Sequence, residues 1–160
     1  MAYRRPPPLG LIVVNYPPLA ETLPHEPPMV LLDRILHSDS SRTECTVKIQ
    51  RDSPFLKGNG VSCIIALEYM AQCIAVRAGL EALERCEKPE PGFLIGCRKM
   101  EFHVAEFPLG SDLIVTTEKS LSVAGFGHFH CEIRNQDQII AAGVLSVATF
   151  SSQNTDSNGS

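Results

Sequence analysis

The stretch SCIIALEYMAQCIAVRAGLEALERC, residues 62–86, is the only long helical candidate in the chain. Its first part is almost continuously apolar, and it becomes amphipathic after Arg77. A helix that is apolar around most of its circumference has to be enclosed by other elements. Gly79 weakens such a helix by about 1 kcal/mol relative to Ala without preventing it. The stretch therefore predicts a central helix that is buried over its first turns.

Strand-like segments surround this helix in the sequence. The run 29–36 is short and apolar, and residues 43–50 alternate, with Cys45, Val47 and Ile49 on one face. After the stop signal EKPEPG at 87–92, four strand-like runs follow at 93–104, 112–121, 126–134 and 138–150. The short turns between them predict antiparallel neighbours. This order predicts an α+β domain whose antiparallel sheet, of about six strands, curls around the helix.

The two ends of the chain differ from the middle. Eight of the 12 prolines lie in the first 28 residues, which allows extended chain and one helical turn near residues 19–23. The last ten residues, SSQNTDSNGS, are polar and are predicted to be disordered. We therefore expect a Pro-rich extension at 1–22, one domain at 23–150 and a tail at 151–160.

Composition excludes several classes of function. The net charge of −4 argues against a general nucleic-acid binder, because neutralising phosphates needs a basic surface. The apolar run 9–14 is too short for a secretory signal, and the run 61–76 is short for a membrane span and contains Glu68. The six cysteines form no C-x-x-C pair. We expect a cytoplasmic protein with free, buried or half-buried thiols, no metal site, no cofactor and no membrane span.

Glu68 is the most informative residue for chemistry. It lies in the middle of the predicted buried helix, with Gln72 four residues later on the same face. A carboxylate buried without a partner is strongly disfavoured, so Glu68 needs a partner or a proton. Such a group suits general acid catalysis near neutral pH. The alternative is that Glu68 only binds Gln72 or reaches solvent.

His25 and the entrance to the helix supply further candidates. His25 lies between prolines in LPHEPP, and an imidazole can act as a base near neutrality, although a loop histidine is more often structural. Gly58, Gly60 and Val61 precede the helix, where backbone N–H groups favour a carbonyl oxygen or an oxyanion. Ser62 is expected to be an ordinary N-cap.

Three segments together resemble the 3-hydroxyacyl-acyl-carrier-protein dehydratases, and more closely the dehydratase-like branch of aryl-polyene gene clusters. They are LPHEPPMVLLDRIL at 23–36, ALEYMAQCIAVRAG at 66–79 and GFLIGCRKMEFHVAEFPLGSDLIV at 92–115. They occur in the order of that family, within a resemblance that covers about residues 23–150. The resemblance implies the hot-dog fold and a homodimer whose two sheets join.

The resemblance also implies a site at the subunit interface, under the start of the helix. In the family, a histidine removes the α-proton of a 3-hydroxyacyl thioester and the helix carboxylate, here Glu68, protonates the departing hydroxyl. Gln72 would orient the carboxylate, and Gly96, in the Phe-Leu-Ile-Gly strand, joins the substrate-binding residues. The product would be the trans-2-enoyl thioester of fatty-acid or polyene synthesis.

One segment departs from the family. Its better-known members carry the catalytic histidine in a Gly-His-Phe-Pro segment upstream of the glutamate, whereas residues 51–63 here read RDSPFLKGNGVSC. Arg51, Asp52 and Ser53 fall near that position and none is an obvious base, so His25 is the best substitute. Three hypotheses stay open: a dehydratase, a thioesterase that uses Glu68 alone, and a non-catalytic subunit that pairs with an active hot-dog partner.

Acyl carrier proteins are acidic, so a carrier-linked substrate would need a basic docking surface. Lys57 beside the helix entrance and Arg98 and Lys99 on the following strand are the candidates. The donor is either an acyl carrier protein or coenzyme A.

Overall fold

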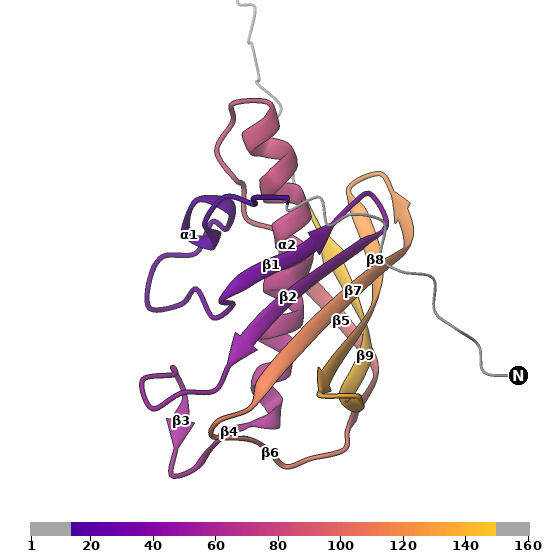
Figure 1. Cartoon of the computed structure of the whole chain (residues 1–160). Coiled ribbons are helices and arrows are strands. Elements are labelled where there is room, and N and C mark those ends of the chain that lie inside the picture. The colour runs from indigo at the N-terminus through magenta and orange to yellow at the C-terminus, as the bar shows by residue number, and fades with distance from the viewer. Residues whose placement is uncertain (1–13, 150–160) are drawn as a thin grey trace, which may run out of the picture.

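Helix α2, Ala66–Glu84, runs along the inside of a curled sheet, as Figure 1 shows. The computed structural model describes residues 14–149. The remaining elements, in chain order, are α1 Leu19–Thr22, β1 Arg34–Ser38, β2 Arg42–Lys48, β3 Leu56–Lys57, β4 Gly60–Ser62, a 3-10 turn at Cys63–Ile65, β5 Phe93–Phe102, β6 Glu106–Pro108, β7 Asp112–Val123, β8 Phe126–Asn135 and β9 Gln138–Ala148.

The large sheet has six antiparallel strands in the order β1-β2-β7-β8-β9-β5. The predicted α+β architecture, with about six strands around one long helix, is thereby confirmed. A second, small sheet has the order β3-β4-β6 and lies at the N-terminal end of α2 (Figure 1). The segments of this small sheet are too short to show a strand pattern in the sequence.

The core forms where α2 faces β2, β7 and β8. Met70, Cys73 and Val76 of the helix are fully buried. They belong to one apolar cluster with buried sheet residues that include Cys45, Val47, Leu113, Val115, Ile133 and Leu145. Burying a side chain of this size contributes about 1.5–3 kcal/mol. The predicted inward face of β2 is confirmed, because Cys45, Val47 and Ile49 are all buried.

Two strand predictions were wrong. Residues 29–33 are not a strand: β1 starts at Arg34, because the backbone groups of Met29 and Leu31 bind a helix side chain and not a neighbouring strand. Strand β5 does not pair with β7, the strand that follows the 108–110 turn. It pairs with β9, because the chain between them forms β6 and joins the small sheet.

The start of the helix also differs from the expectation. Ser62 precedes the 3-10 turn, but its side chain makes no capping hydrogen bond. Ser62 belongs to β4 and is paired with Glu106 of β6. The N–H of Cys63 donates to the carbonyl of Ala105 at 3.0 Å, so a neighbouring strand satisfies this part of the helix entrance.

All six cysteines are free, as predicted. Cys45, Cys73 and Cys131 are buried and Cys63 is half-buried, whereas Cys86 and Cys97 are exposed. The expectation of buried or half-buried thiols was wrong for the last two, because Cys86 follows the free end of α2 and Cys97 lies on the edge strand β5.

By length and hydropathy alone, Cys63–Glu84 would pass as a membrane span, the one such helix within residues 14–149. Half of its most apolar window is buried inside the fold. A mostly buried core helix passes the same length and hydropathy test.

Candidate active site

Glu68 and His25 lie together in one chain. Glu68 is in the first turn of α2, and His25 is in the loop after α1. The Nε2 atom of His25 is 3.4 Å from Oε1 of Glu68. The two side chains are 30% and 39% exposed, so the pair lies at the surface of the single chain. The expected burial of Glu68 is therefore wrong for the single chain, because the first turn of α2 lies at an open end of the sheet-wrapped core, although its predicted hydrogen bond with Gln72 is present. An acid–base pair at this distance can share or exchange a proton through a substrate atom.

Gln72 holds the carboxylate and the His25 loop in a fixed relation. Its Nε2 donates to Oε1 of Glu68 at 2.8 Å and to the carbonyl of Met29 at 2.7 Å. Its Oε1 accepts from the N–H of Leu31 at 2.9 Å. The side chain is fully buried, and these three bonds satisfy the carboxamide. Gln72 therefore ties residues 29–31, and through them the His25 loop, to the helix.

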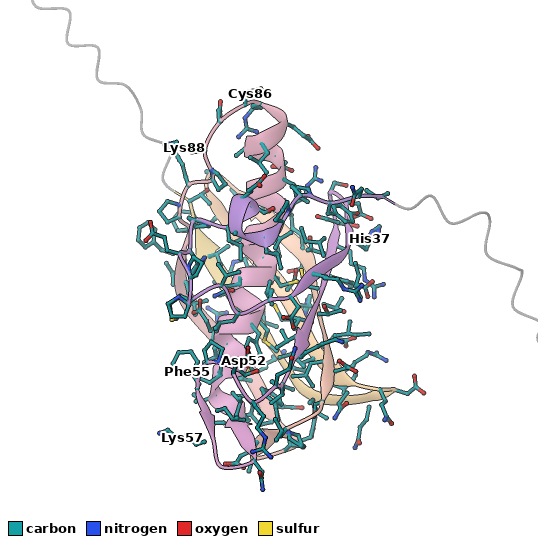
Figure 2. The ribbon with its side chains drawn as sticks, turned by 60° about the vertical axis from the view of Figure 1, so that its left-hand side comes forward. His37, Asp52, Phe55, Lys57, Cys86 and Lys88 are labelled. Atoms are coloured by element: carbon teal, nitrogen blue, oxygen red, sulfur yellow. The ribbon has the colours of Figure 1, made fainter. Side chains whose placement is uncertain are left out.

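The loop at residues 51–55, where the dehydratases have their histidine, is closed by its own hydrogen bonds. Ser53 Oγ accepts from the N–H of Gln50 at 2.7 Å and donates to the carbonyl of Lys48 at 3.2 Å. In Figure 2, Asp52 and Phe55 lie in this loop and Lys57 follows at the tip of β3. None of Arg51, Asp52 and Ser53 forms a hydrogen bond or an ion pair with Glu68 or His25, so the loop supplies no partner to the pair within the described residues.

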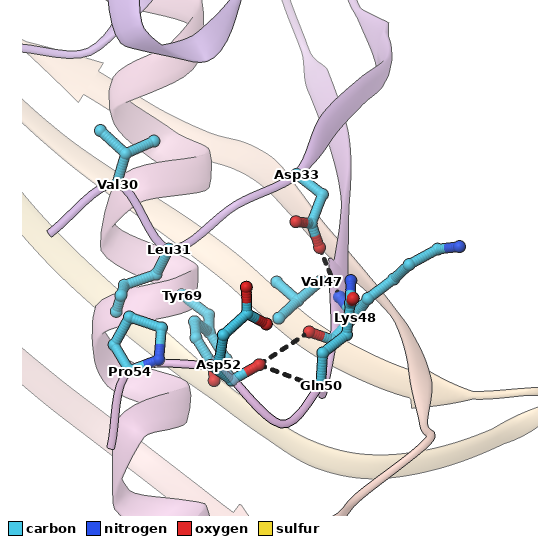
Figure 3. A pocket seen from close by; sticks show the side chains of 10 residues that line it. Val30, Leu31, Asp33, Val47, Lys48, Gln50, Asp52, Pro54 and Tyr69 are labelled. Atoms are coloured by element: carbon cyan, nitrogen blue, oxygen red, sulfur yellow. Dashed lines mark hydrogen bonds between the residues drawn. The ribbon is translucent and has the colours of Figure 1, made fainter. Parts of the chain in front are cut away.

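Leu31 connects the pair to a small cavity of about 160 Å³. Figure 3 shows its walls, formed by Val30, Leu31, Asp33, Val47, Lys48, Gln50, Asp52, Ser53, Pro54 and Tyr69. Tyr69 is 2% exposed, and burial, together with the negative charge of Asp33, raises its pKa to about 12. Its hydroxyl therefore stays protonated. Sequence reasoning missed Tyr69 because a tyrosine in an apolar helix reads as part of the core.

A larger apolar groove of about 600 Å³ lies along the C-terminal half of α2. Its walls include Tyr16, Leu80 and Leu83, with Arg77 and Glu84 at the rim. Neither His25 nor Glu68 lines this groove or the smaller cavity.

The glycines expected to bind substrate are in the small sheet and on β5. Gly58 is in the turn between β3 and β4 with φ +60°, and Gly60 and Val61 form β4, just before the helix entrance. Strand β4 is the middle strand of the small sheet, so its backbone is largely engaged. Gly96 lies apart from them on β5, where an added β-carbon would meet nothing within 4 Å.

The candidate docking residues occupy two elements. Lys57 is on β3, and Arg98 and Lys99 are on β5, where the pairing with β9 is irregular between Arg98 and Glu101. All three are exposed, and none forms an ion pair with another described residue. Across residues 14–149, no three His, Cys, Asp or Glu side chains gather as metal ligands.

Comparison with known proteins bears on this site. A chain of the dehydratase heterocomplex ApeI:P from Xenorhabdus doucetiae superposes with a TM-score of 0.81 at 33% identity, covering 86% of this chain and 94% of that one. The 3-hydroxyacyl-[acyl-carrier-protein] dehydratase FabZ of Chlamydia caviae is 27% identical over 151 residues, which cover 90% of this chain and 97% of that enzyme. The PaaI protein of Escherichia coli, at 16% identity and a TM-score of 0.57, covering 72% of this chain and 81% of that one, shares the fold alone.

The family model that matches the chain is that of the ApeP dehydratase, and the match spans residues 17–157. This range contains His25, Glu68 and Gln72 together with every strand of both sheets. The chain therefore belongs to the ApeP-like dehydratase family.

Proposed function

We propose that this protein dehydrates a 3-hydroxyacyl thioester carried by an acyl carrier protein to the trans-2-enoyl thioester, with Glu68 and His25 in its active site. The observation that carries the proposal is the 3.4 Å approach of His25 Nε2 to Glu68 Oε1. Elimination of water needs one group that takes a proton from C2 and one that gives a proton to the departing hydroxyl. The FabZ relatives, whose names state this reaction, support the same substrate class.

The direct test is the reversible hydration of an enoyl thioester, followed by the loss of enoyl absorbance on carrier-protein and coenzyme A substrates. Glu68→Gln should lower the rate by about 10²–10⁴-fold, the usual contribution of a general acid–base group. Glu81→Gln is the matched control, because Glu81 is on the same helix, is paired with Arg77, and lies outside the pair. Unchanged turnover in Glu68→Gln would remove the proposal, and release of free thiol would indicate a thioesterase.

We also propose that the chain pairs through β5 with another hot-dog subunit. Strand β5 ends the large sheet, and an unpaired strand edge is a template for pairing with a further chain. Leu94 and Ile95 on this strand are 44% and 54% exposed, and large exposed apolar residues mark contact surfaces.

The partner is either a different hot-dog subunit or a second copy of this chain. The relative from Xenorhabdus doucetiae is a heterocomplex, which supports a mixed pair. Without a partner, we expect a homodimer. Ile95→Lys should dissociate the assembly in size-exclusion chromatography with light scattering, because it places a charge on the shared edge. Leu36→Lys, on the opposite edge strand β1, is the control and should leave the assembly intact. An intact assembly in Ile95→Lys would rule out β5 as the contact.

Docking of the carrier protein is the third part. Lys57, Arg98 and Lys99 are exposed cations without ion-pair partners among the described residues, and they suit an acidic carrier. Arg98→Glu should lower kcat/KM about tenfold on the carrier-protein substrate and leave both coenzyme A turnover and the size of the assembly unchanged. Lys88→Glu, at the far end of α2 in Figure 2, is the charge-matched control. An equal loss on both substrates would contradict docking at Arg98.

A further inference from the structure

The two ring nitrogens of His25 have different surroundings. Nε2 lies 3.4 Å from Oε1 of Glu68. Nδ1 is buried and has no hydrogen-bond partner anywhere in residues 14–149. The side chain as a whole is 30% exposed, yet its Nδ1 is enclosed without a partner.

This asymmetry selects one tautomer. A neutral imidazole carries one N–H, and the other nitrogen is an acceptor. An N–H at Nδ1 would be a buried donor without an acceptor, and it would leave the Nε2 lone pair facing a carboxylate oxygen. An N–H at Nε2 instead leaves only a lone pair in the enclosed position, and it places the donor nitrogen 3.4 Å from Oε1 of Glu68. The surroundings of both ring nitrogens therefore favour the tautomer that carries its proton on Nε2.

The same asymmetry opposes His25 as a base. To accept a proton at Nε2, the ring must already carry its other proton at Nδ1, and it keeps that proton there as the imidazolium. Base catalysis would thus place a donor at the one ring position where the described chain provides no acceptor. A histidine base normally has the opposite arrangement, in which a fixed acceptor binds its Nδ1–H.

The two carboxylate oxygens of Glu68 are suited to different tasks. Its Oε1 accepts a hydrogen bond from Gln72 at 2.8 Å and faces His25, so this oxygen is held in place. Its Oε2 has no hydrogen bond within the described chain, and a carboxylate oxygen of this kind can take up a proton.

We propose that Glu68 performs both proton transfers of the dehydration and that His25 is a positioning residue that keeps its protonated Nε2 beside the carboxylate. This rests on the proposed function and reverses the expectation that His25 takes the α-proton. Glu68 Oε2 removes the proton from C2, and the C–H electron pair becomes the C2–C3 double bond. The C3–O bond breaks with its pair on oxygen. The proton on Oε2 then passes to that oxygen, water leaves, and the carboxylate is restored.

The first test is independent of turnover. Nitrogen-15 NMR of the histidine-labelled full chain, at a pH about two units above the ordinary imidazole pKa, distinguishes protonated from unprotonated ring nitrogens. His25→Gln identifies the His25 signals by their loss. We expect a protonated Nε2 and an unprotonated Nδ1, and a proton on Nδ1 would overturn the inference. If the wild type turns over neither substrate, the proposed function fails, while this measurement still decides the tautomer.

The second test separates a donor from a base. His25→Gln keeps an N–H donor and removes a titrating group, so its kcat should stay within about tenfold of wild type. His25→Ala, which removes the donor as well, should lose about 10²-fold, and Glu68→Gln should lose about 10³-fold or more. His103→Gln, at an exposed histidine near Glu101, is the control for general effects. A folded His25→Gln that loses as much as Glu68→Gln would identify His25 as the base and refute the proposal.

Discussion

A β-carbon on Gly79 of α2 would lie 1.8 Å from the carbonyl oxygen of Thr22 in α1. No side chain fits at this distance, so the absence of one lets the short helix rest directly on the long one. Thr22 is fully buried and donates its hydroxyl proton to the carbonyl of Pro18 at 3.0 Å, which closes α1 on itself. His25 follows this helix by a few residues, so the contact at Gly79 sets where the His25 loop begins.

Gly79→Ala should therefore destabilise the protein, although alanine favours a helix. The gain in helix propensity is about 1 kcal/mol, whereas forcing α1 away from α2 costs about 1–3 kcal/mol or more. We expect a lower midpoint of urea unfolding and slower dehydration. Gly92→Ala is the control, because a β-carbon there meets only ordinary contacts at 3.6–3.8 Å. Equal stability of both variants would contradict the close contact.

Gln72→Leu should destabilise the protein by about 2–5 kcal/mol, because the Met29 carbonyl and the Leu31 N–H lose their partner in a buried position. The loss of the hydrogen bond to Glu68 should lower kcat as well. Urea unfolding measures the first effect and enoyl absorbance the second. Gln138→Leu, at an exposed position, should change stability by no more than about 0.5 kcal/mol. A variant as stable as wild type would mean that another group satisfies the segment.

The raised pKa of Tyr69 predicts that the folded protein loses stability in alkaline solution. Its pKa rises from 10.0 to about 12 on folding, because burial and the charge of Asp33 disfavour the phenolate. The folded protein thus holds this proton more tightly than the unfolded chain. The contribution is complete below pH 10 and is lost as the pH rises toward 12, by roughly 2–3 kcal/mol over the two pH units.

Tyr69→Phe removes the titrating group, so its stability should decline less between pH 10 and 12 than that of wild type. Urea midpoints at several pH values measure this difference, and the ultraviolet absorbance of phenolate gives an independent titration. The same decline in both proteins would assign the alkaline transition to other groups.

The exposure of the cysteines predicts which thiols react in the single chain and which of them becomes protected on assembly. In the single chain, Cys86 and Cys97 should react rapidly with a thiol reagent, and Cys45, Cys73 and Cys131 only on unfolding. Partial burial raises the pKa of Cys97, which should make it the slower of the two exposed thiols. If β5 is covered in the assembly, Cys97 becomes protected and Cys86 does not. Mass spectrometry after brief labelling locates the modified residues, and an equally reactive Cys97 in the assembled protein would argue against β5 as the contact.

The sequence predicted the elements whose signals are local. The burial of α2 follows from its apolar run, and the inward face of β2 follows from alternation at Cys45, Val47 and Ile49. The pairing of β5 with β9 was missed, because short turns indicate neighbours only when the intervening chain does not form a strand of its own.

The candidate site shows the same difference between local signals, which the sequence reveals, and long-range contacts, which it does not. His25 and Glu68 were chosen by residue type and by a family resemblance, but nothing local brings them together. Gln72 does so through hydrogen bonds to backbone groups more than 40 residues away in the sequence. Hydrogen bonds of this kind leave no periodic pattern in the sequence. Residues 29–31, which they hold in place, therefore showed only their apolar character, and this looked like a strand.

His25 and Glu68 come from one chain, with the histidine on the loop after α1 and the carboxylate on α2. A second subunit is therefore not needed to supply either side chain, and the single chain keeps both of them when an assembly dissociates.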